Sequence, residues 1–434
     1  MLAINLFMLV YYAIPLYVFT SSSDFSRLVL FAPSSTGLIC IFIFYLSSII
    51  GYKTYRVKID YEYYIPNEKT FVFRTALFIM IFSAVLFLLY CSLFGGFSFV
   101  MLNISSIRSG DVEIGNAKLD FLTKLYPVVI YAPVLLVPFW KKSLLGENGI
   151  KRLYIIMSVI IAFTIRISTG SRGAFLTLFL ILALGSILSN LNSSRHGPFT
   201  KASKNNTRNY ILMTIIAFFA IVILRPLLLY LNNLALYGQA YASDLLVTQL
   251  FSADGRYSIN STKDIFGSLL MSFSHYANTI ELALLKVSSG EHENNYFMEF
   301  VAMLQSIIPS KLLGLTKMHS VTYYNSAYFG SEANIPPGII GSAIYSGGML
   351  WIVLYGYLVG YVGKRIDIFY ARIKRNVTFA SYYYGALWFL FFFFAASGDF
   401  ASQFGKSFTS LLLFLYIYMN LKRKKKSYVT NFNV

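Results

Sequence analysis

The feature that most constrains this chain is a series of apolar runs, each long enough or nearly long enough to cross a lipid bilayer. A transmembrane helix needs about 20 predominantly apolar residues, with about 17 as a common lower limit. Because the runs extend from one end of the chain to the other, we expect one all-α polytopic membrane domain over residues 1–434, with about ten transmembrane helices. The runs lie near residues 3–20, 35–51, 71–92, 122–140, 153–168, 173–190, 210–224, 338–363, 379–397 and 405–420.

Composition supports a membrane protein over a soluble one. Charged residues make up only 12% of the chain and hydrophobic residues 57%, whereas a soluble domain carries about 25% charged residues. The only two cysteines, Cys40 and Cys91, both lie inside apolar runs. We therefore expect two buried thiols, with no disulfide framework and no cysteine-based metal site.

Basic residues are concentrated in alternate loops. Five segments hold 23 of the 36 Lys and Arg but only five acidic residues, so they account for the whole net charge of +18. Cytoplasmic loops of membrane proteins carry such an excess of Lys and Arg. We predict that these segments are cytoplasmic, that both termini are cytoplasmic, and that the charge serves topology and not nucleic-acid binding. The segments are residues 52–75, 141–152, 191–209, 364–375 and 421–427, the last beginning a basic cytoplasmic tail over 421–434.

The same alternation places one long loop, residues 225–337, outside the cell between the seventh and eighth spans. It contains an amphipathic stretch at 264–286 with an apolar stripe at helical spacing, which predicts a helix. A second apolar piece, 300–308, is too short to span and predicts an interfacial or re-entrant helix. The other predicted outer segments are residues 21–34, 93–121, 168–172 and 398–404.

Arginines gather near this outer boundary. Arg166 ends the fifth run and Arg172 begins the sixth, beside free N–H groups at a helix N-terminus. Two guanidinium groups in that setting favour a phosphate site, although arginines that snorkel to lipid headgroups would give the same pattern. Arg225 and Arg256 follow in the long loop and could join the site, or Arg256 could pair with a nearby acid such as Asp254.

Histidines and carboxylates of the outer segments are candidates for proton transfer. His275 lies on the polar face of the amphipathic stretch, and His319 follows two lysines. A lone histidine on a helix is more often structural, so carboxylates compete for the same role. Glu291, His292 and Glu293 are interpreted as a solvated loop tip. The competing carboxylates are Glu281, Glu299, Glu332 and Asp399.

Signatures of soluble enzymes, such as a phosphate-binding Gly-rich loop or a nucleophile elbow, are absent from the sequence. Three other motifs stand out. Gly170-Ser171-Arg172-Gly173-Ala174 joins adjacent spans, Ile308-Pro309-Ser310-Lys311 lies late in the long loop, and Pro336-Pro337-Gly338-Ile339-Ile340-Gly341 opens a Gly-rich span. With the many-span layout and the long outer loop, the chain resembles the Wzy-type oligosaccharide repeat-unit polymerases, also called O-antigen polymerases.

The resemblance implies a GT-C-like membrane glycosyltransferase of the cell inner membrane. Its reaction joins repeat units carried on undecaprenyl pyrophosphate, which serve as both donor and acceptor, into a surface polysaccharide of O-antigen or capsule type. A chain-length regulator protein is an expected partner, besides membrane lipid. Arginines replacing a divalent metal imply that neither metal nor other cofactor is needed. The pyrophosphate-binding candidates are Arg166, Arg172, Arg225, Arg256 and Lys311, and the candidate bases are His275, His319 and Glu332.

Two other functions fit the sequence. An O-antigen ligase, which transfers finished glycan from the same carrier to a lipid A core, would share the layout and the outer Arg and His chemistry. A flippase for lipid-linked oligosaccharide would need charges near the bilayer midplane and commonly shows repeated halves. We find no internal repeat in the sequence, which favours the enzymes.

Overall fold

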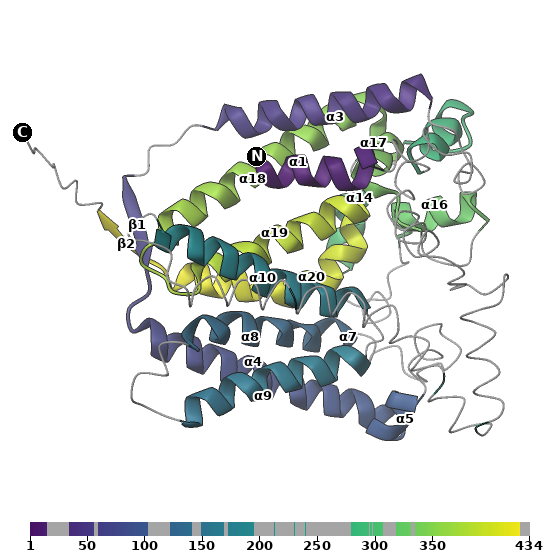
Figure 1. The fold of residues 1–434 in the computed structure, drawn as a ribbon. Helices are drawn as coiled ribbons and strands as arrows, with labels where there is room; N and C mark the ends of the chain where they lie inside the picture. Colours follow the sequence, from purple (N-terminus) through teal and green to yellow (C-terminus); the bar gives the residue numbers. More distant parts are fainter. Residues whose placement is uncertain are drawn as a thin grey trace, which may run out of the picture. The chain divides into compact units, whose positions relative to one another are not determined.

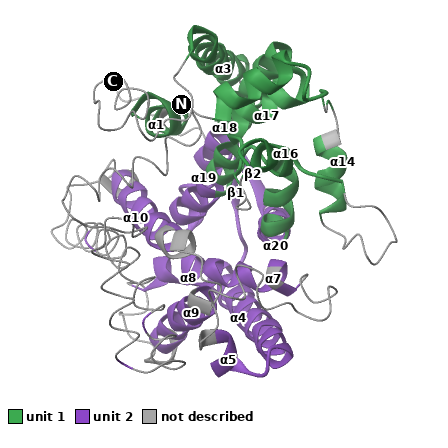
Figure 2. Cartoon of the chain, turned by 90° about the vertical axis from the view of Figure 1, so that its right-hand side faces the viewer, with its two compact units in different colours: residues 1–56, 243–365, 390–408 green, residues 57–242, 366–389, 409–434 purple. Residues whose placement is uncertain are grey.

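The computed structural model is mostly helical and divides into two compact units, which are described separately below (Figures 1 and 2). Unit 1 comprises residues 1–56, 243–365 and 390–408, and unit 2 comprises residues 57–242, 366–389 and 409–434. Helices α18, α19 and α20 contribute residues to both. The structure describes residues 1–14, 34–55, 60–102, 122–140, 149–168, 172–194, 279–294, 296, 298–306, 318–330 and 335–425, with the single residues 212, 230 and 239.

Within the described residues, three helices are long and apolar enough to cross a membrane: α3 (Ser35–Thr54), α4 (Glu68–Leu93) and α19 (Ala380–Ser397). They coincide with three of the predicted runs. Cys40 in α3 and Cys91 in α4 are buried free thiols, as predicted. Four more helices of at least 20 residues overlap predicted runs, namely α9 (Gly149–Ser168), α10 (Arg172–Ser194), α18 (Met349–Ile373) and α20 (Phe400–Met419).

The run at 122–140 was predicted to form one transmembrane helix, but it does not form one regular helix. It divides at its prolines, because a proline has no N–H for the helical ladder and its ring crowds the preceding turn. The four pieces are α7 (Leu122–Leu125), the 3₁₀-helix η3 (Tyr126–Ile130) with Pro127, α8 (Tyr131–Leu136) with Pro133, and the 3₁₀-helix η4 (Val137–Phe139) with Pro138.

The run at 338–363 was also predicted as one span and is instead two helices. Gly348 has φ +70° and separates α17 (Gly338–Gly347) from α18. Only glycine adopts this backbone conformation easily. Helix α18 then continues to Ile373, so Lys364, Arg365 and Arg372 belong to its last turns and not to a loop.

In unit 1, α3 and the first part of α18 run parallel with their backbones in close contact. A Cβ atom on Gly356 would overlap the carbonyl oxygen of Phe44, and one on Gly360 would overlap that of Ser48. Gly51 likewise faces the backbone of Tyr357. Small residues four apart permit this approach between membrane helices.

The core of unit 1 forms around this helix pair. Buried side chains from several short elements surround it, including Tyr12, Phe44, Ile280, Val321 and Tyr345. The short elements bring the N-terminal segment and the long-loop segments to one core. They are α1 (Leu2–Met8), the π-helix η1 (Leu9–Ala13), the helical residues 279–288 and α16 (Val321–Tyr328). Another short helix, α14 (Met298–Gln305), lies between the last two in the chain.

In unit 2, α4, η3, α8 and α9 pack on one another, and α10 contacts α8 and α9 (Figure 1). Aromatic rings fill the contact. Tyr126 lies edge-on to Phe87, with ring centroids 5.7 Å apart, and Tyr90 lies 5.6 Å from Tyr126. The short helix α5 (Phe97–Leu102) packs on α4.

Segments predicted to be cytoplasmic contact one another. In unit 2, β1 (Tyr61–Tyr64) and β2 (Lys422–Lys425) form an antiparallel pair with Tyr61 opposite Lys425. Part of the predicted basic tail is thus a strand. The Thr378 N–H also donates to Glu68 at the start of α4, over 2.5 Å. Segments in contact must lie on the same side of a membrane, so these pairings agree with the charge-based topology.

Candidate functional site

The predicted pyrophosphate-binding arginines are described in part. Arg166 lies in the last turn of α9, close enough to Tyr126 and Tyr131 for electrostatic interaction. Arg172 is the first residue of α10, so the two arginines lie at adjoining helix ends as predicted, but the side chain of Arg172 is not described. The other predicted site residues, apart from His319, lie outside the described residues: Arg225, Arg256, His275, Lys311 and Glu332.

His319, a predicted base, is exposed just before α16 in unit 1. Its ring stacks on Tyr323, with centroids 3.8 Å apart and an angle of 17° between the planes. The next residue, Ser320, is the N-cap of α16. His319 is thus held at the edge of a polar cluster formed by two of the competing carboxylates.

The first of these carboxylates is Glu299, in the first turn of α14 and only 3% exposed. Its Oε1 accepts a hydrogen bond from the N–H of Val321, over 2.5 Å. Its Oε2 is buried and has no hydrogen-bond partner among the described residues. Burial, followed by the negative charge of Asp399, raises the pKa of Glu299 to about 8 against the opposing effect of the Val321 bond.

The second carboxylate, Asp399, lies between α19 and α20 and is 1% exposed. Its Oδ1 accepts from the N–H of Ser402 over 2.7 Å, which makes it the N-cap of α20. Its Oδ2 accepts from the hydroxyl of Ser320 over 3.0 Å. Both oxygens of Asp399 are therefore occupied by donors that complement a negative charge.

The N-terminus of α16 links the two carboxylates, because Ser320 binds Asp399 and the adjacent Val321 binds Glu299. Gly398 has φ +65°, and a Cβ atom there would overlap the carbonyl oxygen of Gly338. This close approach fixes the position of the following residue, Asp399.

A third competing carboxylate, Glu281, has a structural role. Its Oε1 accepts from the N–H of Ser34 over 2.8 Å, and the hydroxyl of Ser34 accepts in turn from the N–H of Gly37 over 3.0 Å. Ser34 is the N-cap of α3. Glu281 therefore links the helical residues 279–288 of the long loop to the N-terminus of α3.

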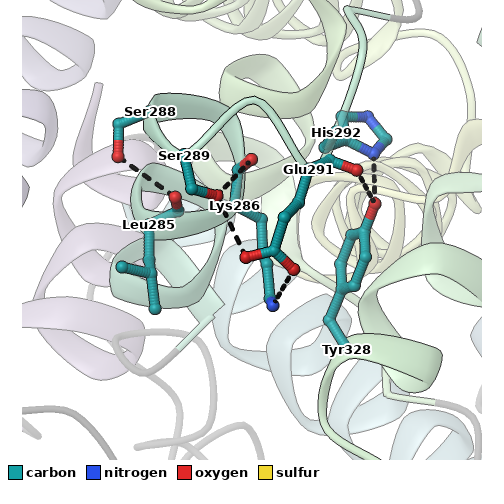
Figure 3. A network of polar contacts seen from close by, with 7 residues as sticks. All are labelled: Leu285, Lys286, Ser288, Ser289, Glu291, His292 and Tyr328. Carbon is teal, nitrogen blue, oxygen red and sulfur yellow. Dashed lines mark hydrogen bonds and ion pairs between the residues drawn. The ribbon is translucent and has the colours of Figure 1, made fainter.

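The interpretation of residues 291–293 as a solvated tip is wrong for His292. Glu291 and Glu293 are exposed, but His292 is 6% exposed and its Nδ1 lies 2.9 Å from the hydroxyl of Tyr328 (Figure 3). Burial lowers the pKa of this imidazole. Tyr345 packs edge-on, 4.7 Å away. Three aromatic neighbours, including Tyr324, surround the ring, so we assign His292 a structural role.

Helix α14 has two distinct faces. Glu299 and Ala302 are buried, whereas Phe300 is 58% and Leu304 50% exposed. Exposed apolar residues at i and i+4 on a short helix are typical of an element that lies against a membrane surface. Glu299 thus lies on the protein side of an apolar, outward-facing helix.

Predicted outer segments meet at this site. Glu299, Ser320 and Val321 belong to the predicted long outer loop, and Asp399 belongs to the last predicted outer segment. These contacts all lie within unit 1. The carboxylate pair therefore sits where segments predicted to be outside the cell come together.

Chemically, the pair combines a buried carboxyl group of raised pKa with a charged neighbour. Such pairs are common where protons are transferred, because a group whose pKa lies near the working pH can both take and release a proton. Among the described residues, no three His, Cys, Asp or Glu side chains are grouped as metal ligands. The burial of the pair and the raised pKa of Glu299 support acid–base chemistry at this carboxyl group.

Sequence reasoning ranked histidines above Glu299 and Asp399. The two acids are 100 positions apart, so their proximity was not readable from spacing. One signal was available: Glu299 and Asp399 each border an apolar segment, where an acid is costly unless it has a partner or a function.

No protein-family model, curated protein or solved structure matches the chain.

Proposed function

We propose that this protein is a polymerase that joins undecaprenyl-pyrophosphate-linked oligosaccharide repeat units at the outer face of the cytoplasmic membrane. In this proposal the chain crosses the membrane about ten times, with both termini inside and residues 225–337 outside. The growing glycan is transferred from its lipid pyrophosphate to a hydroxyl of a second lipid-linked unit. The product is a surface polysaccharide of O-antigen or capsule type.

One observation carries the proposal: the buried Glu299–Asp399 pair lies where predicted outer segments meet, behind an outward-facing apolar helix. Lipid-linked repeat units present their sugars at the outer boundary, with the prenyl chain in the bilayer. A site at that boundary with acid–base groups matches the needs of glycosyl transfer better than a site buried at the midplane would.

The leaving group needs cationic partners. As the anomeric C–O bond breaks, charge develops on the pyrophosphate oxygens, and fixed guanidinium groups stabilise that charge. Arg166 and Arg172, at the adjoining ends of α9 and α10, are the described candidates. Arg225, Arg256 and Lys311 complete the proposed set, and the proposal requires neither a metal nor another cofactor.

Replacement of Arg172 tests this proposal. Purified protein reconstituted with one defined lipid-linked repeat unit should give a ladder of glycans on a gel. Arg172→Ala should abolish the ladder and Arg172→Lys should weaken it, because lysine cannot form the bidentate contact of arginine. Arg375→Ala, at an exposed predicted cytoplasmic position, is the matched control and should polymerise normally. Normal ladders from both Arg172 variants would remove this residue from the site.

A flippase is the second candidate, because a buried carboxyl group that holds a proton near neutral pH is also typical of proton-coupled transporters. The purified protein in detergent separates the two functions, since no transport is possible without a membrane barrier. New glycosidic bonds under these conditions support the enzyme, whereas proton-dependent movement of lipid-linked glycan in vesicles without new bonds supports the flippase. A ligase would instead require lipid A core as acceptor.

A further inference from the structure

We propose that Glu299 is the catalytic base that takes the proton of the acceptor hydroxyl, with Asp399 as its positioning residue. The inference rests on the proposed polymerase function and assigns the base within it. Sequence reasoning had favoured His275, His319 and Glu332 for this role. The geometry of the described residues points instead to the carboxyl group in α14.

The two carboxyl oxygens of Glu299 differ in their hydrogen bonding. Oε1 is fixed by the N–H of Val321, whereas Oε2 is buried without a hydrogen-bond partner in the described part of the chain. A buried carboxyl oxygen without a partner is costly, and such groups persist where they have a task. A sugar hydroxyl is the type of donor that this oxygen lacks.

The surroundings make Glu299 a stronger base than an ordinary carboxylate. The groups around it are Asp399 from the α19–α20 turn, Tyr355 from α18 and the α16 N-terminus, which is flanked by the exposed His319. Burial and the charge of Asp399 raise its pKa to about 8. A base is most effective when its pKa lies near the working pH.

Asp399 is suited to hold a charge and not to transfer a proton. Ser402 and Ser320 donate to its two oxygens, and both bonds stabilise a negative charge there. Its contribution is therefore to raise the proton affinity of Glu299 and, through Ser320, to fix the α16 turn that holds Glu299 in place.

In the proposed step, one bond to the anomeric carbon forms as another breaks. The acceptor hydroxyl oxygen forms a bond to the anomeric carbon of the donor glycan, while the bond from that carbon to the pyrophosphate oxygen breaks. The bonding electron pair leaves with undecaprenyl pyrophosphate. The hydroxyl proton passes to Oε2 of Glu299 and is later released to water.

The test uses the full-length protein in detergent with a lipid-linked repeat unit as donor and acceptor, at pH 6 to 9.5. The wild-type rate should rise with pH through an apparent pKa of about 8. Glu299→Gln should lower kcat by about 100-fold or more with little change in KM, because the amide keeps the shape but cannot accept the proton. Asp399→Asn should stay active with its rising limb displaced to lower pH.

Glu281→Gln is the matched control, because that carboxyl group accepts a hydrogen bond from Ser34, the N-cap of α3, and its rate should match the wild type. A Glu299→Gln variant with the wild-type rate, or an Asp399→Asn profile that does not move, would overturn the assignment while leaving the polymerase proposal intact. A wild-type protein that forms no glycosidic bond would refute both. Melting curves for each variant show that an inactive protein is folded.

Discussion

The hydrogen-bonded carboxylates of unit 2 differ from the Glu299–Asp399 pair of unit 1. In unit 2, Glu68 accepts from both the N–H and the hydroxyl of Thr378. In the same unit, Asp367 accepts from Tyr384 over 2.6 Å. In unit 1, Glu299 and Asp399 are buried near one another, and one oxygen of Glu299 has no partner in the described residues.

This difference separates structural from functional use of charge. A carboxylate whose oxygens accept well-placed hydrogen bonds contributes to stability, whereas two buried neighbouring carboxyl groups oppose folding and are retained only when something else is gained. One helix contact of each unit differs too: α3 and α18 in unit 1 approach through glycines, whereas aromatic rings fill the contact between α4 and η3 in unit 2. Substitutions at five positions test these contrasts.

The largest effect is expected at the glycine contact of unit 1. Gly360→Leu should leave little folded protein, because a side chain there overlaps the backbone of α3 at Ser48 and would force the helices apart. The measurement is the yield of monodisperse protein after detergent extraction. A normal yield would show that α3 and α18 are not in backbone contact.

A pair of alanine variants gives the matched control. A Cβ at Gly385 in α19 makes only ordinary contacts at 3.6 Å or more, so Gly385→Ala should be neutral or slightly stabilising. Gly360→Ala should cost about 3 kcal/mol, the upper part of the usual range for overpacking. Equal melting temperatures for the two variants would contradict the close approach of the helices.

The next largest effect concerns Glu299 and depends on pH. Its pKa is about 8 in the folded protein against an ordinary value of 4.5, so the folded state binds more protons than the unfolded state between these values. Stability should therefore fall as pH rises from 4.5 to 8, by up to about 1.4 kcal/mol per pH unit. Glu299→Gln removes this loss.

The measurement is the melting temperature of the wild type and Glu299→Gln at pH 5 and pH 9. From pH 5 to pH 9, the stability of the variant relative to the wild type should increase, by at most about 5 kcal/mol in free energy of unfolding. A constant difference across this range would mean that Glu299 titrates normally and would weaken its assignment as the base.

Replacement of Glu68 should lower the stability of the protein, whereas replacement of Glu299 should raise it at high pH. Glu68→Ala removes the acceptor for the N–H and hydroxyl of Thr378, and the expected loss is about 2 kcal/mol at neutral pH, since hydrogen bonds to charged groups are stronger than neutral ones. Thermal unfolding compared with Glu68→Gln, which keeps an acceptor, measures it. If Glu68→Ala were as stable as wild type, the proposed division between structural and functional carboxylates would fail.

Much of this organisation could be predicted from sequence because it depends on local composition. The runs that became α3, α4 and α19 were found from length and apolarity, and the pairing of β1 with β2 agrees with sides assigned from charge. The breaks at Pro127, Pro133 and Gly348 were visible as residues, but their effect in a membrane helix depends on neighbours.

The candidate site was less predictable because it depends on contacts between distant segments. From the sequence, Glu299 and Asp399 are only competing candidates for proton transfer, and His292 is predicted to be solvated. Burial decides all three cases, and burial of a loop residue depends on which segments fold over it. A histidine in a Glu-His-Glu sequence carries no local sign that it will lie against Tyr328 and Tyr345.

The smallest effect is expected at the ion pair of Arg375 with Glu62 in unit 2. The charged atoms are 3.9 Å apart and the Arg375 side chain is 56% exposed, so water screens their attraction. Exposed pairs of this kind contribute about 0.5 kcal/mol or less. Arg375→Ala should therefore melt within about 2 °C of the wild type at both low and high salt. A larger loss that disappears in salt would mean that charge pairing stabilises unit 2 as well, and that the contrast with the buried acids of unit 1 reflects solvent exposure more than function.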